Sequence, residues 1–430
     1  MSDWDEMAFS NAFEINPKIG LIKGKEYPFV DMQSLDSGTR SVESHQNREY
    51  SGGGSKFQHR DVLLARITPC LENGKIARYW NLSKKDAHGS TELIVIRGRQ
   101  GITDTDFVYY VVRSPQVHQY AISQMTGTSG RQRVPTDAFD HLTIPIPDLD
   151  EQRAIAHILG TLDDKIELNR CMNETLEGIA RALFKSWFID FDPVRAKAEG
   201  RKPFGMDQET AALFPDQFED SELGEIPKGW TVIPLDKIAN FLNGLALQKY
   251  PPTGTDSIPV IKIAELNRGI NEGTSRASNV PDDYIVDDGD VLFSWSGSLE
   301  LKIWCEGKGA LNQHLFKVTS EDYPSWFYYQ WVGHHLDTFQ KIAAGKATTM
   351  GHIQRHHLTE TLTVVPTNDV LDIANNIFMP MFDLYITNSA NNRILTQVRD
   401  NLLSKLISGE LRVDPSRFGF DPEGEKVGEV

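Results

Sequence analysis

Two carboxylates and a lysine in the second half of the chain have the spacing of a metal site. Asp290 precedes Glu300-Leu301-Lys302, and metal-dependent nucleases use such a set to hold Mg²⁺ and to support the attacking water. A structural explanation competes, because Asp290 repeats Asp61 at the entry to a strand, whereas only Glu72-Asn73-Gly74-Lys75 lies near Asp61. We therefore expect Asp290 to serve the strand, and we keep a nuclease as the alternative.

The other residues capable of chemistry do not form a recognisable site. Five histidines gather in the second half, namely His334, His335, His352, His356 and His357. No carboxylate or cysteine accompanies them at the spacing of metal ligands, which favours surface or DNA-facing side chains. The odd number of cysteines, without Cys-x-x-Cys spacing, argues against disulfides and structural zinc.

Sequence motifs for common cofactors are also missing. The chain has no G-x-x-x-x-G-K-S/T phosphate loop, no G-x-G-x-x-G after a strand and no H-E-x-x-H. It also lacks the Asn-Pro-Pro-aromatic or Asp-Pro-Pro-aromatic sequence of amino-methyltransferases. We therefore predict no catalytic residue, no bound metal and no cofactor held by this chain.

The elements that would position any site occur twice. Residues 61–64, 107–110 and 142–144 recur as 290–293, 326–329 and 362–364, and a long helical pattern follows each set. The offset is 219 or 220 residues for the second and third sets, as between Tyr109 and Tyr328, and 229 for the first. In the first half we expect strands at 62–67, 92–96 and 142–146 and a helix at about 107–125. Two similar α+β units form a pseudo-twofold object, which suits a target with two half-sites.

The two long helical patterns share a coiled-coil seam. In the first pattern the seam includes Leu159, Leu162, Ile166, Asn169, Asn173, Leu176 and Leu183, with spacings that alternate between four and three. In the second it includes Met381, Tyr385, Asn388, Asn392, Leu395 and Leu402. Buried asparagines fix register, so we expect Asn169 and Asn173 to meet Asn388 and Asn392 in an antiparallel pairing. The alternative is two amphipathic helices that each pack on their own domain.

Composition restricts the class of protein. The chain has 430 residues, 40% of them hydrophobic, which suffices for two or three domains with real cores. The net charge of −16 is concentrated in residues 190–225 and in the tail after Asp414, so the acidic balance neither supports nor excludes DNA binding. The N-terminus lacks a signal sequence and no long apolar run occurs, so we expect a cytoplasmic protein without a membrane partner.

Several separated blocks resemble one known family. They are Glu151-Gln152-Arg153, Leu183 to Val194, Leu223 to Trp230 and Leu402 to Leu411. In this order they are similar to the blocks of type I restriction-modification specificity (S) subunits. The resemblance covers nearly the whole chain. The second helix departs from the pattern, because Leu371-Asp372-Ile373 stands in place of a second Glu-Gln-Arg, which puts its register in doubt.

The resemblance implies two target recognition domains joined by two long helices that form an antiparallel coiled coil. The corresponding ranges are domain 1 at 1–149, a helix at 150–190, a connector at 191–229, domain 2 at 230–367, a helix at 368–412 and a polar tail at 413–430. It also implies a non-catalytic reader of a bipartite DNA site. Two methyltransferase subunits would bind the helices, and restriction and translocase subunits can join them. S-adenosylmethionine, ATP and Mg²⁺ would belong to those partners. The alternatives are a stand-alone metal-dependent DNA endonuclease and a scaffold without sequence preference.

Candidate DNA contacts lie in loops at equivalent places of the two halves. Glycine freedom and hydrogen-bond donors suit them to bases or phosphates. In the first half the candidates are Lys56, Arg66, Thr128, Ser129, Arg131 and Arg133. In the second half they are Ser294, Trp295, Ser296, Lys346, Thr348, Thr349 and His352. Loops that cap a domain or dock the methyltransferase are the competing explanation.

Overall fold

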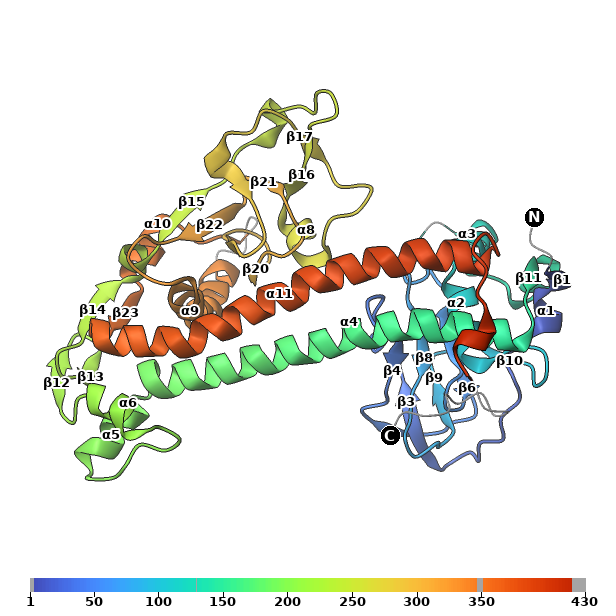
Figure 1. Ribbon diagram of the computed structural model, residues 1–430, viewed down its shortest axis with the longest axis horizontal. Helices are drawn as coiled ribbons and strands as arrows, with labels where there is room; N and C mark the ends of the chain where they lie inside the picture. The colour runs from blue at the N-terminus through green and yellow to red at the C-terminus, as the bar shows by residue number, and fades with distance from the viewer. Residues whose placement is uncertain (1–3, 129, 346–350, 420–430) are drawn as a thin grey trace. The chain divides into compact units, whose positions relative to one another are not determined.

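The structure is a computed structural model that describes residues 4–128, 130–345 and 351–419. The chain divides into two compact units, and both long helices pass from one unit into the other (Figure 1). Unit 1 comprises Met1–Glu167 with Leu395–Val430, and unit 2 comprises Leu168–Ile394. No helix within the described ranges is both long and apolar enough to span a bilayer.

Unit 1 is built on two small sheets. The five-stranded sheet has the order β2 (Phe13–Ile15), β10 (Leu93–Gly98), β7 (Val62–Ala65), β8 (Ile76–Tyr79) and β4 (Ser41–Val42). The second sheet has the order β5 (Asn47–Glu49), β3 (Glu26–Val30), β9 (Ala87–Gly89) and β6 (Ser55–Phe57). β1 (Asp5–Ala8) pairs with β11 (Thr143–Ile146), and the helices are α1 (Phe9–Ala12), α2 (Thr105–Arg113) and α3 (Pro115–Ser123). All the side chains of β7 are buried, which explains its unbroken apolar sequence.

Unit 2 repeats this plan. One sheet has the order β15 (Asn240–Asn243), β22 (Leu315–Thr319), β19 (Val291–Ser294) and β20 (Leu301–Ile303). The other has the order β17 (Arg276–Ala277), β16 (Ile258–Ile261), β21 (Gly309–Leu311) and β18 (Ile285–Val286). β12 (Phe218–Ser221) pairs with β13 (Gly224–Pro227), and β14 (Thr231–Pro234) pairs with β23 (Leu362–Val365). The helices are α5 (Asp192–Ala198), α6 (Gln208–Leu213), α7 (Leu235–Ile238), α8 (Ile263–Arg268), α9 (Ser325–Ala344) and α10 (Arg355–Glu360).

The predicted single helix at 107–125 is wrong, because two helices occupy this stretch. α2 ends at Arg113 and α3 begins at Pro115. Proline cannot donate a backbone hydrogen bond to the preceding turn, and it suits the first turn of a new helix. The Ser114 hydroxyl accepts a bond from the Val117 N–H at 3.4 Å and caps α3. The equivalent helix of unit 2, α9, runs unbroken over Ser325–Ala344.

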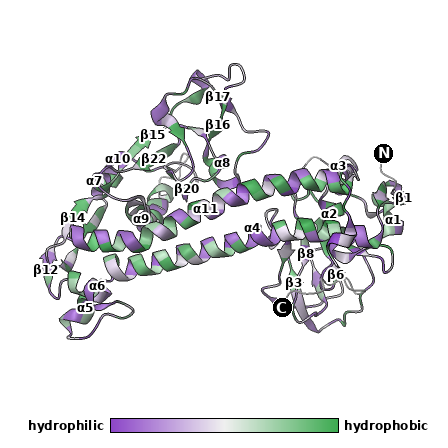
Figure 2. Cartoon of the chain, viewed as in Figure 1, coloured by the Kyte–Doolittle hydropathy of each residue, from purple (hydrophilic) through white to green (hydrophobic). Residues whose placement is uncertain are grey.

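The long helices are α4 (Leu149–Phe184), which continues into a π-helical turn at Lys185–Ile189, and α11 (Asn368–Ile407). α11 is shorter than the predicted 368–412, because Gly409 adopts a left-handed φ of 71°. Apolar and polar residues alternate along both helices (Figure 2). Every predicted seam residue is buried or half-buried.

The contacts between α4 and α11 confirm the antiparallel pairing within each unit. In unit 2 the Asn169 Nδ2 donates to Asn392 Oδ1 at 2.9 Å, and Asn388 Nδ2 donates to Asn173 Oδ1 at 3.0 Å. Residue numbers therefore rise along one helix as they fall along the other. In unit 1, Asp163 pairs with Arg399 at 2.8 Å, and the earlier Glu151 pairs with the later Arg412 at 2.7 Å, so the order is again reversed.

Candidate nucleic-acid interface

The two candidate segments of unit 1 lie side by side. The Thr68 N–H donates to the Gln132 carbonyl at 3.0 Å, and the Val134 N–H donates to the Arg66 carbonyl at 2.9 Å. Ile67 forms an isolated bridge with Arg133 between these two bonds. The segment that follows β7 and the loop that follows α3 are therefore paired through their backbones.

Unit 2 brings its candidate segments together through the same contacts. The Gly297 N–H donates to the Gly351 carbonyl at 2.9 Å, and the Ile353 N–H donates to the Trp295 carbonyl at 3.0 Å. Ser296 forms an isolated bridge with His352. A cavity of about 420 Å³ adjoins this surface, lined in part by Gly297, Ser298, Gln340 and Gly351.

In unit 1 the most constrained polar side chain at this surface is Arg133. Its Nε lies 3.0 Å and 2.9 Å from the two carboxylate oxygens of Glu92, and its Nη2 donates to Glu92 Oε1 at 2.7 Å. The hydrogen bond from Arg133 lowers the pKa of the Glu92 carboxyl, so Glu92 stays ionised at neutral pH. Arg66 Nε and Thr68 Oγ1 are buried nearby without a hydrogen-bond partner among the described residues.

The remaining candidates of unit 1 differ in exposure. Thr128 and Arg131 are exposed, and the Arg131 N–H donates to the Thr128 carbonyl at 3.0 Å. Lys56 is half-buried in β6, with its ammonium 5.4 Å from the Tyr50 ring centre, outside the paired segments. Ser129 lies outside the described residues, as do Lys346, Thr348 and Thr349 of unit 2.

In unit 2 the predicted segment at 294–296 is largely buried, with Ser296 3% exposed. Ser294 is fully buried, and its hydroxyl donates to the Ser298 carbonyl at 2.7 Å, so it shapes the turn. The half-buried Trp295 donates its indole N–H to Asn243 Oδ1 at 2.8 Å. Ser296 Oγ lies 2.9 Å from His314 Nδ1. Any role in DNA contact stays a prediction for all of these residues.

Glu92 and His314 are absent from the predicted set, although both lie at this surface. Each comes directly before a strand, β10 or β22, and neither belongs to a glycine-rich loop. The Arg66 N–H donates to the Glu92 carbonyl at 2.9 Å, and the Trp295 N–H donates to the His314 carbonyl at 3.3 Å. The internal repeat was the available signal, because these two residues precede equivalent strands.

Two residues of the nuclease alternative, Asp290 and Lys302, make structural contacts. Asp290 Oδ2 accepts the Asp287 N–H and pairs with Lys317 at 2.8 Å. Lys302 Nζ donates to the Leu266 carbonyl at 2.7 Å. Asp61 has the equivalent role in unit 1, where it accepts the Gln58 N–H at 2.7 Å and pairs with Arg97 of β10. These contacts explain why Asp61 and Asp290 recur at the entry to β7 and β19.

The clustered histidines lie on separate elements of unit 2. His334 and His335 belong to α9, and burial lowers the pKa of His335 to about 4, so its ring is neutral at physiological pH. His356 and His357 belong to α10, with ring centres 4.0 Å apart. In the described part of the chain, no group of three or more histidine, cysteine or acidic side chains is arranged to hold a metal ion.

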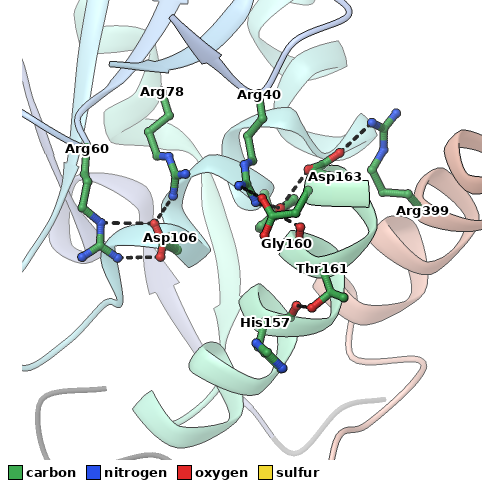
Figure 3. Close-up of polar contacts among 11 residues, drawn as sticks. Arg40, Arg60, Arg78, Asp106, His157, Gly160, Thr161, Asp163 and Arg399 are labelled. Carbon is green, nitrogen blue, oxygen red and sulfur yellow. Dashed lines mark hydrogen bonds and ion pairs between the residues drawn. The ribbon is translucent and has the colours of Figure 1, made fainter. Parts of the chain in front are cut away.

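A network in unit 1 anchors the domain to both long helices (Figure 3). Asp163 of α4 accepts bonds from the Tyr110 hydroxyl and from Arg399, both at 2.8 Å. Arg40 donates to the Gly160 carbonyl at 3.2 Å and pairs with the Asp164 carboxylate. Burial raises the pKa of Tyr110, so its hydroxyl remains a donor.

The start of α4 forms a second anchor through the Glu-Gln-Arg block. Glu151 accepts the Trp4 indole N–H at 3.0 Å and pairs with Arg412 at 2.7 Å. Gln152 accepts the Asp104 N–H at 2.7 Å, and its amide donates to two carbonyls. At the start of α11 the chain instead buries the apolar Leu371, which explains the departure from this block in unit 2.

Comparison with known proteins agrees with this architecture. Residues 1–178 match the family model described as the type I restriction modification DNA specificity domain. The chain is 26% identical over 469 residues to the HindI specificity subunit of Haemophilus influenzae, covering 96% of this chain and 100% of that protein. It is 26% identical over 320 residues to the MjaIX specificity subunit of Methanocaldococcus jannaschii, covering 72% and 70%. The fold resembles that of an S subunit from M. genitalium with a TM-score of 0.52, 14% identity and coverage of 94% and 96%.

Proposed function

Because the chain belongs to the family of type I restriction-modification specificity subunits, we propose that each of its units reads one half of a split, asymmetric DNA sequence. The observation that carries the proposal is the repeated surface, where the same backbone contacts pair two loops in both units. Two loop pairs with the same backbone contacts but different side chains suit two different half-sites. Polar side chains there would read base edges, and basic residues such as Arg131 would contact phosphates.

The proposal assigns chemistry to partner subunits. S-adenosylmethionine would be bound by methyltransferase subunits, and ATP and Mg²⁺ would be used by the restriction and translocase subunits that can join them. The contacts of Asp290 with Lys317 and of Lys302 with a backbone carbonyl support a non-catalytic role, because these groups are already used by the fold. Incubation of the isolated chain with Mg²⁺, ATP and S-adenosylmethionine should leave DNA unchanged, and partner-free cleavage would favour the nuclease.

The outer faces of the long helices are the proposed docking surface for the methyltransferase. Within unit 2, large apolar side chains of α4 and α11 point away from the seam, with Leu168 54% exposed, Ile179 51% and Ile394 53%. Ile377 and Leu384 add to this surface. Apolar side chains repeated along a helix pair are suited to a partner that covers them.

Genome-wide mapping of methylated adenines, with the methyltransferase partner co-expressed, tests the proposed reading role. We expect methylation at one split motif, and methylation without a sequence motif would support the scaffold instead. The helices should set the gap between the half-sites. An insertion between Asp150 and Ile155 would break the Glu151 and Gln152 anchors, so both helices should be lengthened together elsewhere.

Seven residues inserted after Glu167 and seven after Ile394 would keep the seam in phase, because the coiled-coil period is seven. Each helix would lengthen by about 10 Å. With about 3.4 Å per base pair, the unread gap should grow by about three base pairs, while both half-sites stay the same. An altered half-site with an unaltered gap would show that the helices do not set the spacing.

A further inference from the structure

The paired loops contain backbone positions that correspond one to one between the units. Ile67 and Ser296 occupy the same place, since each forms the bridge to the second loop. Arg133 and His352 are the residues on the other side of that bridge. This correspondence rests on the two matched backbone hydrogen bonds that flank the bridge in each unit, and on no likeness between the side chains.

A third position completes the set. The residue before Ile67 donates its backbone N–H to the carbonyl of Glu92, and the residue before Ser296 donates in the same way to His314. The Glu92 side chain reaches Arg133, and Ser296 Oγ lies 2.9 Å from the His314 ring. At these three positions unit 1 carries isoleucine, glutamate and arginine, and unit 2 carries serine and two histidines. The serine, Ser296, is buried, so in unit 2 the histidines are the candidates for contact.

The hydrogen bonds of Arg133 leave a specific set of donors open. A guanidinium carries five N–H groups. The Nε and one Nη2 hydrogen face Glu92, and one Nη1 hydrogen reaches the Arg131 carbonyl at 3.3 Å. Among the described residues, one N–H on each terminal nitrogen therefore remains, and 43% of the side chain is exposed. Glu92 binds one edge of the Arg133 guanidinium and fixes its plane, so the two remaining N–H donors lie side by side and match two adjacent acceptors.

We propose that Arg133, held in plane by Glu92, reads a guanine through its O6 and N7 atoms in the major groove, within the half-site of unit 1. Guanine is the base whose major-groove edge offers two acceptors side by side. Glu92 is then a positioning residue. His352 with His314 occupies the equivalent reading position for the other half-site. This inference rests on the proposed function.

A phosphate is a poorer partner for this pair. Glu92 neutralises Arg133 and would itself repel a phosphate, whereas the exposed Arg131 in the same loop has no carboxylate partner among the described residues. Phosphate contacts also need no fixed plane, and the carboxylate provides one here. Within this loop, Arg131 is therefore suited to contact a DNA phosphate, and Arg133 is suited to contact a base.

The test compares methylation maps and duplex binding for the full chain in complex with its methyltransferase partner. For Arg133→Ala and Arg133→Lys, one guanine of one half-site should become degenerate, while the other half-site stays intact. Lysine keeps the positive charge but lacks the paired donors of a guanidinium, so the Lys variant distinguishes base recognition from electrostatic attraction to DNA. His352→Ala should alter only the opposite half-site, and Arg131→Ala should alter neither.

A duplex with 7-deazaguanine at the affected position removes the N7 acceptor without changing the protein. Wild-type binding should fall by about tenfold or more, and binding by Arg133→Ala should not fall further. Glu92→Gln should reduce the discrimination against other bases at this position more than it reduces affinity for the cognate site.

The results separate the inference from the proposed function. If the wild-type complex methylates no split motif, the proposed function fails. If it does, but Arg133→Lys keeps the guanine and 7-deazaguanine binds normally, only the present inference fails. Loss of affinity on all sequences alike in Arg133→Ala, with a shallower salt dependence, would make Arg133 a phosphate contact and would also overturn it. Because the 7-deazaguanine arm uses wild-type protein, a variant that does not fold leaves the test decisive.

Discussion

Asp163 should carry much of the attachment of unit 1 to the long helices. Its side chain is 6% exposed, and it accepts hydrogen bonds from Arg399 and from the Tyr110 hydroxyl, both at 2.8 Å. Asp163→Ala would leave the equally buried Arg399 with only the exposed Asp400. Removal of one partner of a buried ion pair costs about 3–5 kcal/mol, because the other charge stays desolvated. An orphaned hydroxyl adds to the loss.

The adjacent residue provides a matched control. Asp164 is 67% exposed in its side chain, and its partner Arg40, which is 20% exposed, also donates to the Gly160 carbonyl. An ion pair with a solvent-exposed carboxylate contributes about 0–1 kcal/mol, so Asp164→Ala should change little. The two substitutions remove the same carboxylate one residue apart, in the same helix, and differ chiefly in burial.

Hydrogen exchange followed by mass spectrometry suits this comparison, because it reports the stability of each segment of the full chain separately. In Asp163→Ala, the amides of α2 and of the first half of α4 should exchange roughly a hundredfold to a few thousandfold faster, in line with about 3–5 kcal/mol. Equal protection in the Asp163 and Asp164 variants would refute the reasoning, because burial would then not decide the cost.

Three further outcomes follow from named contacts. Asn173→Leu should destabilise the helix pair by leaving Asn388 Nδ2 unpaired, and the double change Asn173→Leu/Asn388→Leu should recover part of the loss; a urea-unfolding cycle with no coupling would contradict this. Burial would raise the pKa of Glu151, but hydrogen bonds from Arg412, a backbone N–H and an indole outweigh burial and lower that pKa. Glu151→Gln should therefore destabilise unit 1 at pH 7, and the difference in stability between wild type and variant should shrink as pH falls below about 4. A difference that stays constant with pH would show that ionisation of Glu151 does not contribute to stability. Arg131→Ala should make the slope of log affinity against log salt shallower by about 1, and an unchanged slope would exclude a phosphate contact.

The sequence was sufficient to predict the architecture. The seam positions and the asparagine pairs are local patterns with a fixed period. They recur in both halves of the chain, so each occurrence supported the prediction of a paired helix from the other. Asn169 and Asn173 meet Asn392 and Asn388 because a buried amide has few other ways to satisfy its hydrogen bonds. The break at Ser114 was missed because apolar periodicity continues across it, although Pro115 was visible in the sequence.

The site was less predictable, because its contacts join residues distant in sequence. Arg133 was expected to face DNA, but the pattern did not show that Glu92 would hold it, 41 positions earlier in the chain. Ser294 lies in a polar stretch that reads as a loop, yet it is fully buried and shapes a turn. Short polar segments carry no periodicity from which the direction of each side chain could be inferred.

The internal repeat separates structural positions from functional ones within a single chain. Tyr110 and Tyr329 are equivalent, and each donates its hydroxyl to a carboxylate of α4, Asp163 in unit 1 and Glu177 in unit 2. Positions that keep the same chemistry in both halves thus serve attachment and folding.

At the paired loops the opposite holds, since equivalent backbone positions carry Arg133 in one unit and His352 in the other. If the units read different half-sites, divergence must fall where the frame is rigid and the side chains reach outward. In a duplicated DNA-binding chain, base-contacting residues are therefore expected where the two units share the backbone arrangement but carry different side chains. Exchange of the side chains at the equivalent paired-loop positions should accordingly exchange the base preferences of the two units and leave the long helices unchanged.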